Sequence, residues 1–200
     1  NSVVNNEKLR VIYNKNLTKI TKYHSELSQN KLIYKKFLKI KSGRYYQNLT
    51  VPQKKIIADE ILGFELGGVG LDSTKKSEFK KIISRLSKLS ASFEENLLDS
   101  VNNYSLLIKD KNRLKGIPKD VLVKAKIDAK LQKKSGWVFS LNFPSYMPVM
   151  QYADDRELRK QIYYAYATKA SDLSDKNKDN TDNINKILLN KQRLANLLGF

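Results

Sequence analysis

Apolar residues recur three or four positions apart through most of this 200-residue chain. That spacing gathers side chains along one face of an α-helix, and such faces bury themselves against other helices. The predicted fold class is therefore mostly α. The pattern predicts helices over about residues 9–27, 30–40, 50–67, 73–109, 119–133, 155–171 and 181–198, with a short helix near Pro144 and Pro148.

The longest predicted helix begins at Asp72 or Ser73, either of which can cap it, and runs to Lys109. Unbroken, it would span roughly 55 Å at 1.5 Å per residue, which is long for a compact domain of this size. A helix of that length suits one wall of a larger structure. Its apolar face is formed by Phe79, Ile82, Ile83, Leu86, Leu89, Phe93, Leu97, Val101 and Tyr104.

Capping residues mark the ends of other predicted helices. The second helix places Ile33, Phe37 and Ile40 inward and ends near Ser42-Gly43. Caps precede three further helices: Thr50, with Gln53 completing a capping box, then Asp154-Asp155, and then Thr181 or Asp182.

A single β element interrupts the helical pattern. Trp137, Phe139 and Leu141 alternate with more polar residues, as in a strand with one buried face, and they are predicted to be core residues. A lone strand leaves its backbone groups unpaired, so it needs a partner strand or an open edge. Because no linker divides the sequence, residues 1–200 are predicted to form a single helical segment.

Composition narrows the possible environments and partners. A formal net charge of +18 is typical of proteins that bind nucleic acid or an anionic membrane surface. Only seven of the 38 basic residues are arginine, however, and the arginine fork is the side chain best suited to phosphate. Solvated lysines on helix faces explain the charge without nucleic acid. The absence of cysteine and of any apolar run of about 20 residues favours a cytoplasmic protein that makes no contact with a membrane.

The sequence offers no set of metal ligands. An H-E-x-x-H zinc site needs two imidazoles one helical turn apart and a third ligand. This chain has one histidine, His24, and no cysteine. We therefore predict no catalytic, cofactor-binding or metal-binding residue in the segment, and a half-buried structural role for His24.

Three other clusters have simpler explanations than chemistry. The carboxylate pairs Glu94-Glu95 and Asp154-Asp155 fit solvated or capping roles, because adjacent helical residues point about 100° apart. Gly63 to Gly70 superficially resembles a phosphate loop, but it follows a helix and lacks a Gly-Lys-Ser/Thr ending. Lys39 to Asn48 interleaves basic and aromatic residues and is the best nucleic-acid candidate, although packed tyrosines under solvated lysines explain it equally well.

Four motifs in order resemble the N-terminal half of the thimet-type zinc oligopeptidases, and in particular their bacterial oligopeptidase A branch. They span essentially the whole chain. The motifs are the turn Phe64 to Leu71, the aromatic strand before Pro144-Ser145-Tyr146-Met147-Pro148-Val149-Met150, the helix Arg159 to Tyr166, and the ending Leu194 to Phe200.

The resemblance implies a mostly helical N-terminal portion that forms one wall of a deep channel. In that family a zinc enzyme cuts short peptides, and its zinc ligands and general base would lie beyond Phe200. The start at Asn1, without methionine, fits a cut within a longer protein. The expected partners are the catalytic remainder of the same polypeptide and short peptides, with no nucleic acid and no membrane. The alternative is a stand-alone basic helical module that binds nucleic acid or protein.

Overall fold

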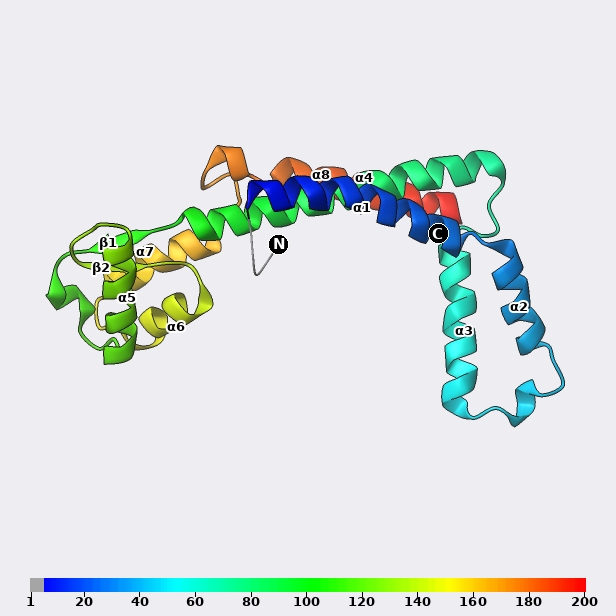
Figure 1. Cartoon of the computed structure of the whole chain (residues 1–200), viewed down its shortest axis with the longest axis horizontal. Helices are drawn as coiled ribbons and strands as arrows, with labels where there is room; N and C mark the ends of the chain where they lie inside the picture. Colours follow the sequence, from blue (N-terminus) through cyan, green and yellow to red (C-terminus); the bar gives the residue numbers. More distant parts are fainter. Residues whose placement is uncertain (1–5) are drawn as a thin grey trace. The chain divides into compact units, whose positions relative to one another are not determined.

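A computed structural model describes residues 6–200 of the chain (Figure 1). Within that range the structure is mostly helical, and two short strands form its one sheet. The predicted fold class is confirmed. The elements are α1 (Glu7–Ser28), α2 (Lys31–Lys41), η1 (Tyr46–Asn48), α3 (Val51–Leu66), α4 (Ser73–Asn103), β1 (Leu106–Ile108), η2 (Lys111–Leu114), α5 (Lys119–Leu131), β2 (Trp137–Phe139), α6 (Phe143–Tyr152), α7 (Arg156–Ala167), η3 (Lys176–Lys178) and α8 (Thr181–Leu198).

The chain divides into two compact units. The first contains residues 1–91 and 185–200, and the second contains residues 92–184. Both divisions fall within helices, α4 and α8, and neither falls in a loop. The absence of a Pro- or Gly-rich linker in the sequence is consistent with this arrangement.

The first unit is built from helices alone. α2 and α3 lie side by side as a helical hairpin (Figure 1), and Thr21 of α1 contacts Ser87 of α4. Phe64 of α3 lies 5.9 Å, ring to ring, from both Tyr34 and Phe37 of α2. Buried residues from α3, the following turn and α4 form the rest of this core, namely Ile57, Ile61, Val69, Phe79 and Ile82.

The second unit surrounds a two-stranded antiparallel sheet. Leu106 pairs with Phe139, Leu107 with Val138 and Ile108 with Trp137. Helix α5 packs on β2, and α6 packs on α7. The side chains of Phe139, Val149, Leu158 and Ile162 are completely buried, and they join Ile108, Leu114, Ile117, Ala125, Leu141, Tyr146 and Ala153 in one core.

The structure corrects the predicted length of the long helix. α4 ends at Asn103, and the next residues turn into β1. The apolar residues from 104 to 108 fit a helical face and a strand equally well, so their periodicity did not separate the two. Residues 106–108 form a strand and not a helix because the strand pairs with β2 and satisfies its backbone hydrogen bonds.

Some predicted inward faces are exposed. Ile40 is 48% exposed, whereas Ile33 and Phe37 are partly buried as predicted. On α1, the apolar stripe that includes Ile12 and Ile20 is also exposed, and Ser25 is the residue that becomes buried. Of this stripe, Leu9 and Leu17 are partly buried, so only part of the apolar face of α1 is covered.

Two helix ends also differ from the prediction. α7 stops at Ala167, and Ala170 adopts the left-handed conformation with φ of 54°. The last helix begins at Thr181, so neither Thr181 nor Asp182 is its cap. Asn180 precedes it, and the Asn180 carbonyl accepts the first turn's hydrogen bond from the N–H of Ile184 at 2.8 Å. The other predicted caps are confirmed: Oε1 of Gln53 accepts from the Thr50 N–H at 2.9 Å, and Oδ1 of Asp72 accepts from the Lys75 N–H at 2.9 Å.

Candidate functional site

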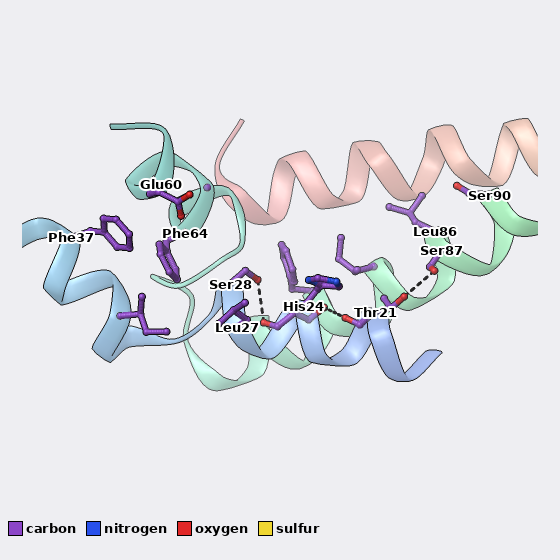
Figure 2. Close-up of a pocket in the computed structure, with 15 residues that line it drawn as sticks. Thr21, His24, Leu27, Ser28, Phe37, Glu60, Phe64, Leu86, Ser87 and Ser90 are labelled. Carbon is purple, nitrogen blue, oxygen red and sulfur yellow. Dashed lines mark hydrogen bonds between the residues drawn. The ribbon is translucent and has the colours of Figure 1, made fainter. Parts of the chain in front are cut away.

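The best-formed concave surface of the first unit is an apolar pocket between α1, α2, α3 and α4 (Figure 2). Its volume is about 760 Å³. Pockets of this size and apolar character accept drug-sized or side-chain-sized ligands. The pocket is therefore the candidate functional site of this chain.

Aromatic and aliphatic side chains form the apolar walls. Phe37 and Phe64 lie on α2 and α3, and Phe79 and Leu86 lie on α4 (Figure 2). Gly63 on α3 also lines the pocket, and a Cβ added there would meet no atom within 4 Å. The glycine thus enlarges the pocket by omitting a side chain.

Hydroxyl groups line the α1 side of the pocket, and they are engaged within the chain. Thr21 Oγ1 and Ser87 Oγ share a hydrogen bond of 3.0 Å that joins α1 to α4. Ser25 Oγ donates to the carbonyl of Thr21 at 2.9 Å, and Ser28 Oγ donates to the carbonyl of Ser25 at 3.2 Å. The first of these bonds fastens α1 to α4, and the other two lie within α1 and satisfy its serine hydroxyls.

His24 lies at this pocket and is exposed, which corrects the predicted half-buried position. The pocket that it lines is open to solvent, so the apolar pattern of α1 did not predict its exposure. Its ring contacts Tyr23 edge to face, with 5.6 Å between the ring centroids. Glu60 is the only carboxylate lining the pocket. One imidazole and one carboxylate are too few ligands for a zinc site.

The donor set of the chain does not fit a resident zinc ion. Across residues 6–200, no three His, Cys, Asp or Glu side chains cluster as metal ligands do. The two imidazoles of an H-E-x-x-H motif cannot come from a chain with one histidine. The mostly apolar lining of the pocket is suited to binding an apolar group.

The predicted carboxylate pairs are not among the residues that line the pocket. Asp155 caps α7, as predicted: its Oδ1 accepts from the Glu157 and Leu158 N–H groups at 2.9 and 3.1 Å. Hydrogen bonds from Arg113 and then from Leu158 hold the pKa of Asp155 below its usual value. Glu94 is an exposed residue of α4. Asp155 thus has the predicted capping role, and Glu94 the predicted solvated one.

The glycine-rich turn ends one helix and leads to the next, as predicted. Gly67 is the C-cap of α3, and Gly68 adopts the left-handed conformation with φ of 78°. A Cβ on Gly67 would lie 2.6 Å from Ser28 Cβ, so α1 approaches the turn closely. The glycines therefore serve helix packing.

The basic and aromatic segment from Lys39 to Asn48 forms a smaller pocket of about 510 Å³ at the end of α2. Each of its tyrosine rings has a cation of the same chain nearby. The Arg44 guanidinium lies 4.7 Å from the centroid of the Tyr45 ring, and Lys54 Nζ lies 5.7 Å from that of Tyr46. Tyr45 is nevertheless 65% exposed, and Tyr46 is partly buried.

The aromatic strand belongs mainly to the core, as predicted. Phe139 and Leu141 are buried, and Trp137 is half-buried with Lys126 Nζ 5.9 Å from its ring centroid. Val138 is buried as well, so β2 is covered on both faces. The alternating pattern alone predicted only one buried face.

The apolar pocket was not predicted from the sequence. A signal for it existed in the small residues Thr21, Ser25 and Ser28, which recur at helical spacing on α1 and mark a face that lets another helix approach closely. The pocket also needs residues from three other helices, and the sequence does not show that these helices meet.

Among residues 6–200, no helix is long and apolar enough to cross a membrane.

Comparison with known proteins decides the resemblance. The family model described as Neurolysin/Thimet oligopeptidase, N-terminal domain, matches residues 1–76. Over the whole chain, 35% of residues are identical to "Oligopeptidase A" of Escherichia coli (strain K12), and the match covers 30% of that protein. The predicted resemblance to the thimet-type oligopeptidases is confirmed.

Further relatives of the oligopeptidase type give the same picture. "Oligopeptidase A" of Haemophilus influenzae is 36% identical over the whole chain and 30% of its own length. "Probable cytosolic oligopeptidase A" of Arabidopsis thaliana is 35% identical over 90% of this chain and 26% of its own length. The chain thus spans about a third or less of the curated relatives it matches.

Proposed function

We propose that this chain is the N-terminal, non-catalytic part of a zinc metallo-oligopeptidase that hydrolyses short peptides inside a deep channel. The observation that carries the proposal is the 35% identity to oligopeptidase A over the whole chain, combined with a match to only 30% of that protein. The zinc site and general base would lie in the remainder of the same polypeptide, and no catalytic residue lies in this segment.

The exposed apolar side chains of α1 support a role as part of a larger wall. Ile12 is 58% exposed and Tyr23 is 61% exposed. Both lie on the apolar face of α1, which the sequence pattern predicted to be buried. A monomer rarely leaves a contiguous apolar stripe uncovered. Contact with the remainder of the enzyme would cover that stripe. The proposal includes a cytoplasmic location, in line with the name of the Arabidopsis relative, and neither nucleic acid nor membrane as a partner.

The proposal is tested with an internally quenched short peptide. The purified chain is assayed with added zinc, with a chelator, and after mixing with the separately produced remainder of the enzyme. We expect no cleavage by the chain alone and chelator-sensitive cleavage after mixing. Chelator-sensitive cleavage by the chain alone, with contaminating peptidases excluded, would refute the non-catalytic assignment.

A further inference from the structure

A second groove of the first unit lies between α4 and α8 and has a very different character from the apolar pocket. Its volume is about 790 Å³. Five cationic side chains line it, and Glu78 is its one carboxylate. The cations are Lys80, Lys81, Arg85 and Lys88 of α4 and Arg193 of α8.

The five cations are not neutralised by the chain. In the part of the chain that the structure describes, none of them forms an ion pair with a carboxylate, whereas Lys55, Lys124 and Lys178 do. A further lysine lies next to the groove: burial first, and the charges of Lys31 and Lys80 second, lower the pKa of Lys76. Unpaired like charges along one groove raise the local positive potential, and a bound anion would relieve their repulsion.

Two aliphatic side chains also line the groove: Ile82, which is buried, and Leu89, which is partly buried. Its other lining residues are the uncharged polar Ser77, Ser84 and Asn190, and none is aromatic. Single-stranded nucleic acid is held by aromatic platforms on which bases stack, and this groove lacks them. A groove that combines five cations with aliphatic side chains matches a peptide that carries both carboxylate and aliphatic side chains.

We infer that the groove between α4 and α8 is a docking site for an acidic peptide segment that interleaves Asp or Glu with aliphatic residues. The lysines and arginines would pair with the carboxylates, and Ile82 and Leu89 would contact the aliphatic side chains. The inference concerns binding by this chain itself, so it can fail or succeed independently of the proposed peptidase function.

The test measures fluorescence anisotropy of a labelled short peptide of repeating Asp-Asp-Leu with the full 200-residue chain at low salt. A peptide of repeating Asn-Asn-Leu controls for charge, and an oligothymidylate of equal net charge represents nucleic acid. The groove variant combines Lys81→Gln, Arg85→Gln and Lys88→Gln. A control variant combines Lys109→Gln, Lys119→Gln and Lys130→Gln, which are exposed residues of the second unit and change the net charge equally.

We expect the acidic peptide to bind and the neutral peptide not to bind. The groove variant should weaken acidic-peptide binding by about tenfold or more, since each exposed ion pair contributes modestly and three are removed. The control variant should change it by less than about twofold. Glu78→Gln should tighten binding, because it removes the one carboxylate of the groove.

Three results would overturn the inference. The first is no binding of the acidic peptide at low salt. The second is an equal loss in the groove and control variants, which would mean that the peptide responds to net charge and not to the groove. The third is that the oligothymidylate binds more tightly than the peptide and that the groove variant weakens its binding as strongly. That result would make the groove a nucleic-acid site.

Discussion

Nε of Arg113 donates a hydrogen bond of 2.6 Å to Oδ2 of Asp155. Both side chains remain partly exposed. The other oxygen of the same carboxylate caps the N-terminus of α7. The Asp155 side chain therefore links the start of α7 to η2, which contains Arg113. The carboxylate of Asp155 thus accepts three hydrogen bonds, from Arg113, Glu157 and Leu158.

Replacing Asp155 with Asn should lower the free energy of unfolding by about 1 kcal/mol near neutral pH. Asn remains a good cap, so the loss comes from the charge facing Arg113 and the helix dipole, reduced by solvent screening. The pKa of Asp155 is lowered in the folded state, so its carboxylate stabilises the fold above the unfolded pKa of about 4, and that contribution is lost as pH falls through the folded pKa.

Urea unfolding of the wild-type chain and the Asp155→Asn variant at a series of pH values checks this. The difference between them should be full near neutral pH and should shrink at acidic pH. Arg113→Gln should reduce the effect of the Asp155 substitution in a double-mutant cycle. A difference that stays constant across the whole series would contradict the role assigned to the ionised carboxylate.

Gly116→Ala should destabilise the second unit by about 3 kcal/mol or more. Gly116 has φ of 85°, and an added Cβ would lie 1.9 Å from the carbonyl oxygen of Tyr152. Neither the backbone conformation nor the packing tolerates a methyl group there. Thermal unfolding measures the effect, with Gly70→Ala as the control because a Cβ at Gly70 meets no atom within 4 Å. Equal melting temperatures for the two variants would contradict this packing.

Lys133→Gly should stabilise the chain by about 1 kcal/mol. Lys133 follows the end of α5 with φ of 55°, a left-handed conformation that glycine adopts without strain. The N–H of Lys134 donates back to the Ala129 carbonyl at 2.9 Å, which completes the helix-ending motif. Lys130→Gly, inside α5, should instead cost about 1 kcal/mol. Chemical denaturation should therefore show opposite signs for the two glycine substitutions.

Gly63→Ala should raise the free energy of unfolding by about 0.5–1 kcal/mol. Gly63 lies inside α3, and alanine gains helix propensity there without a clash. Gly67→Ala is the matched control and should destabilise, because its Cβ would lie 2.6 Å from Ser28 Cβ. A larger side chain, in Gly63→Leu, should fill the apolar pocket and reduce the fluorescence of bound ANS. Unchanged ANS fluorescence in a folded Gly63→Leu variant would show that the dye binds elsewhere.

Periodicity located the helices well where the pattern was long. The face of α4 that carries Phe79 and Ile82 is buried as predicted. The periodicity gave the wrong end for α4, because the residues from Tyr104 to Ile108 satisfy both a helical and an extended pattern. The partner strand was expected from the unpaired edge of β2, but its position depended on which segment could reach that edge.

The candidate site could not be predicted from the sequence, because it also depends on contacts between distant segments. The absence of an H-E-x-x-H motif follows directly from the single histidine of the chain. The apolar pocket, in contrast, exists because side chains from four helices converge around Gly63, and no local pattern specifies that convergence. The unpaired cations of the α4–α8 groove likewise depend on which carboxylates the fold places within reach.

The sequence by itself determined the mostly helical class, most helix caps, the core strand and the resemblance to the thimet-type oligopeptidases. These depend on local spacing and local hydrogen bonding, which are encoded within a few residues. Only the tertiary structure decided that Ile12, Ile20 and Tyr23 of the α1 stripe stay exposed, that Ser25 is buried, and that His24 is exposed at the apolar pocket. Which face of an amphipathic helix is covered depends on the neighbours available to pack against it, and these are set by contacts between distant parts of the chain.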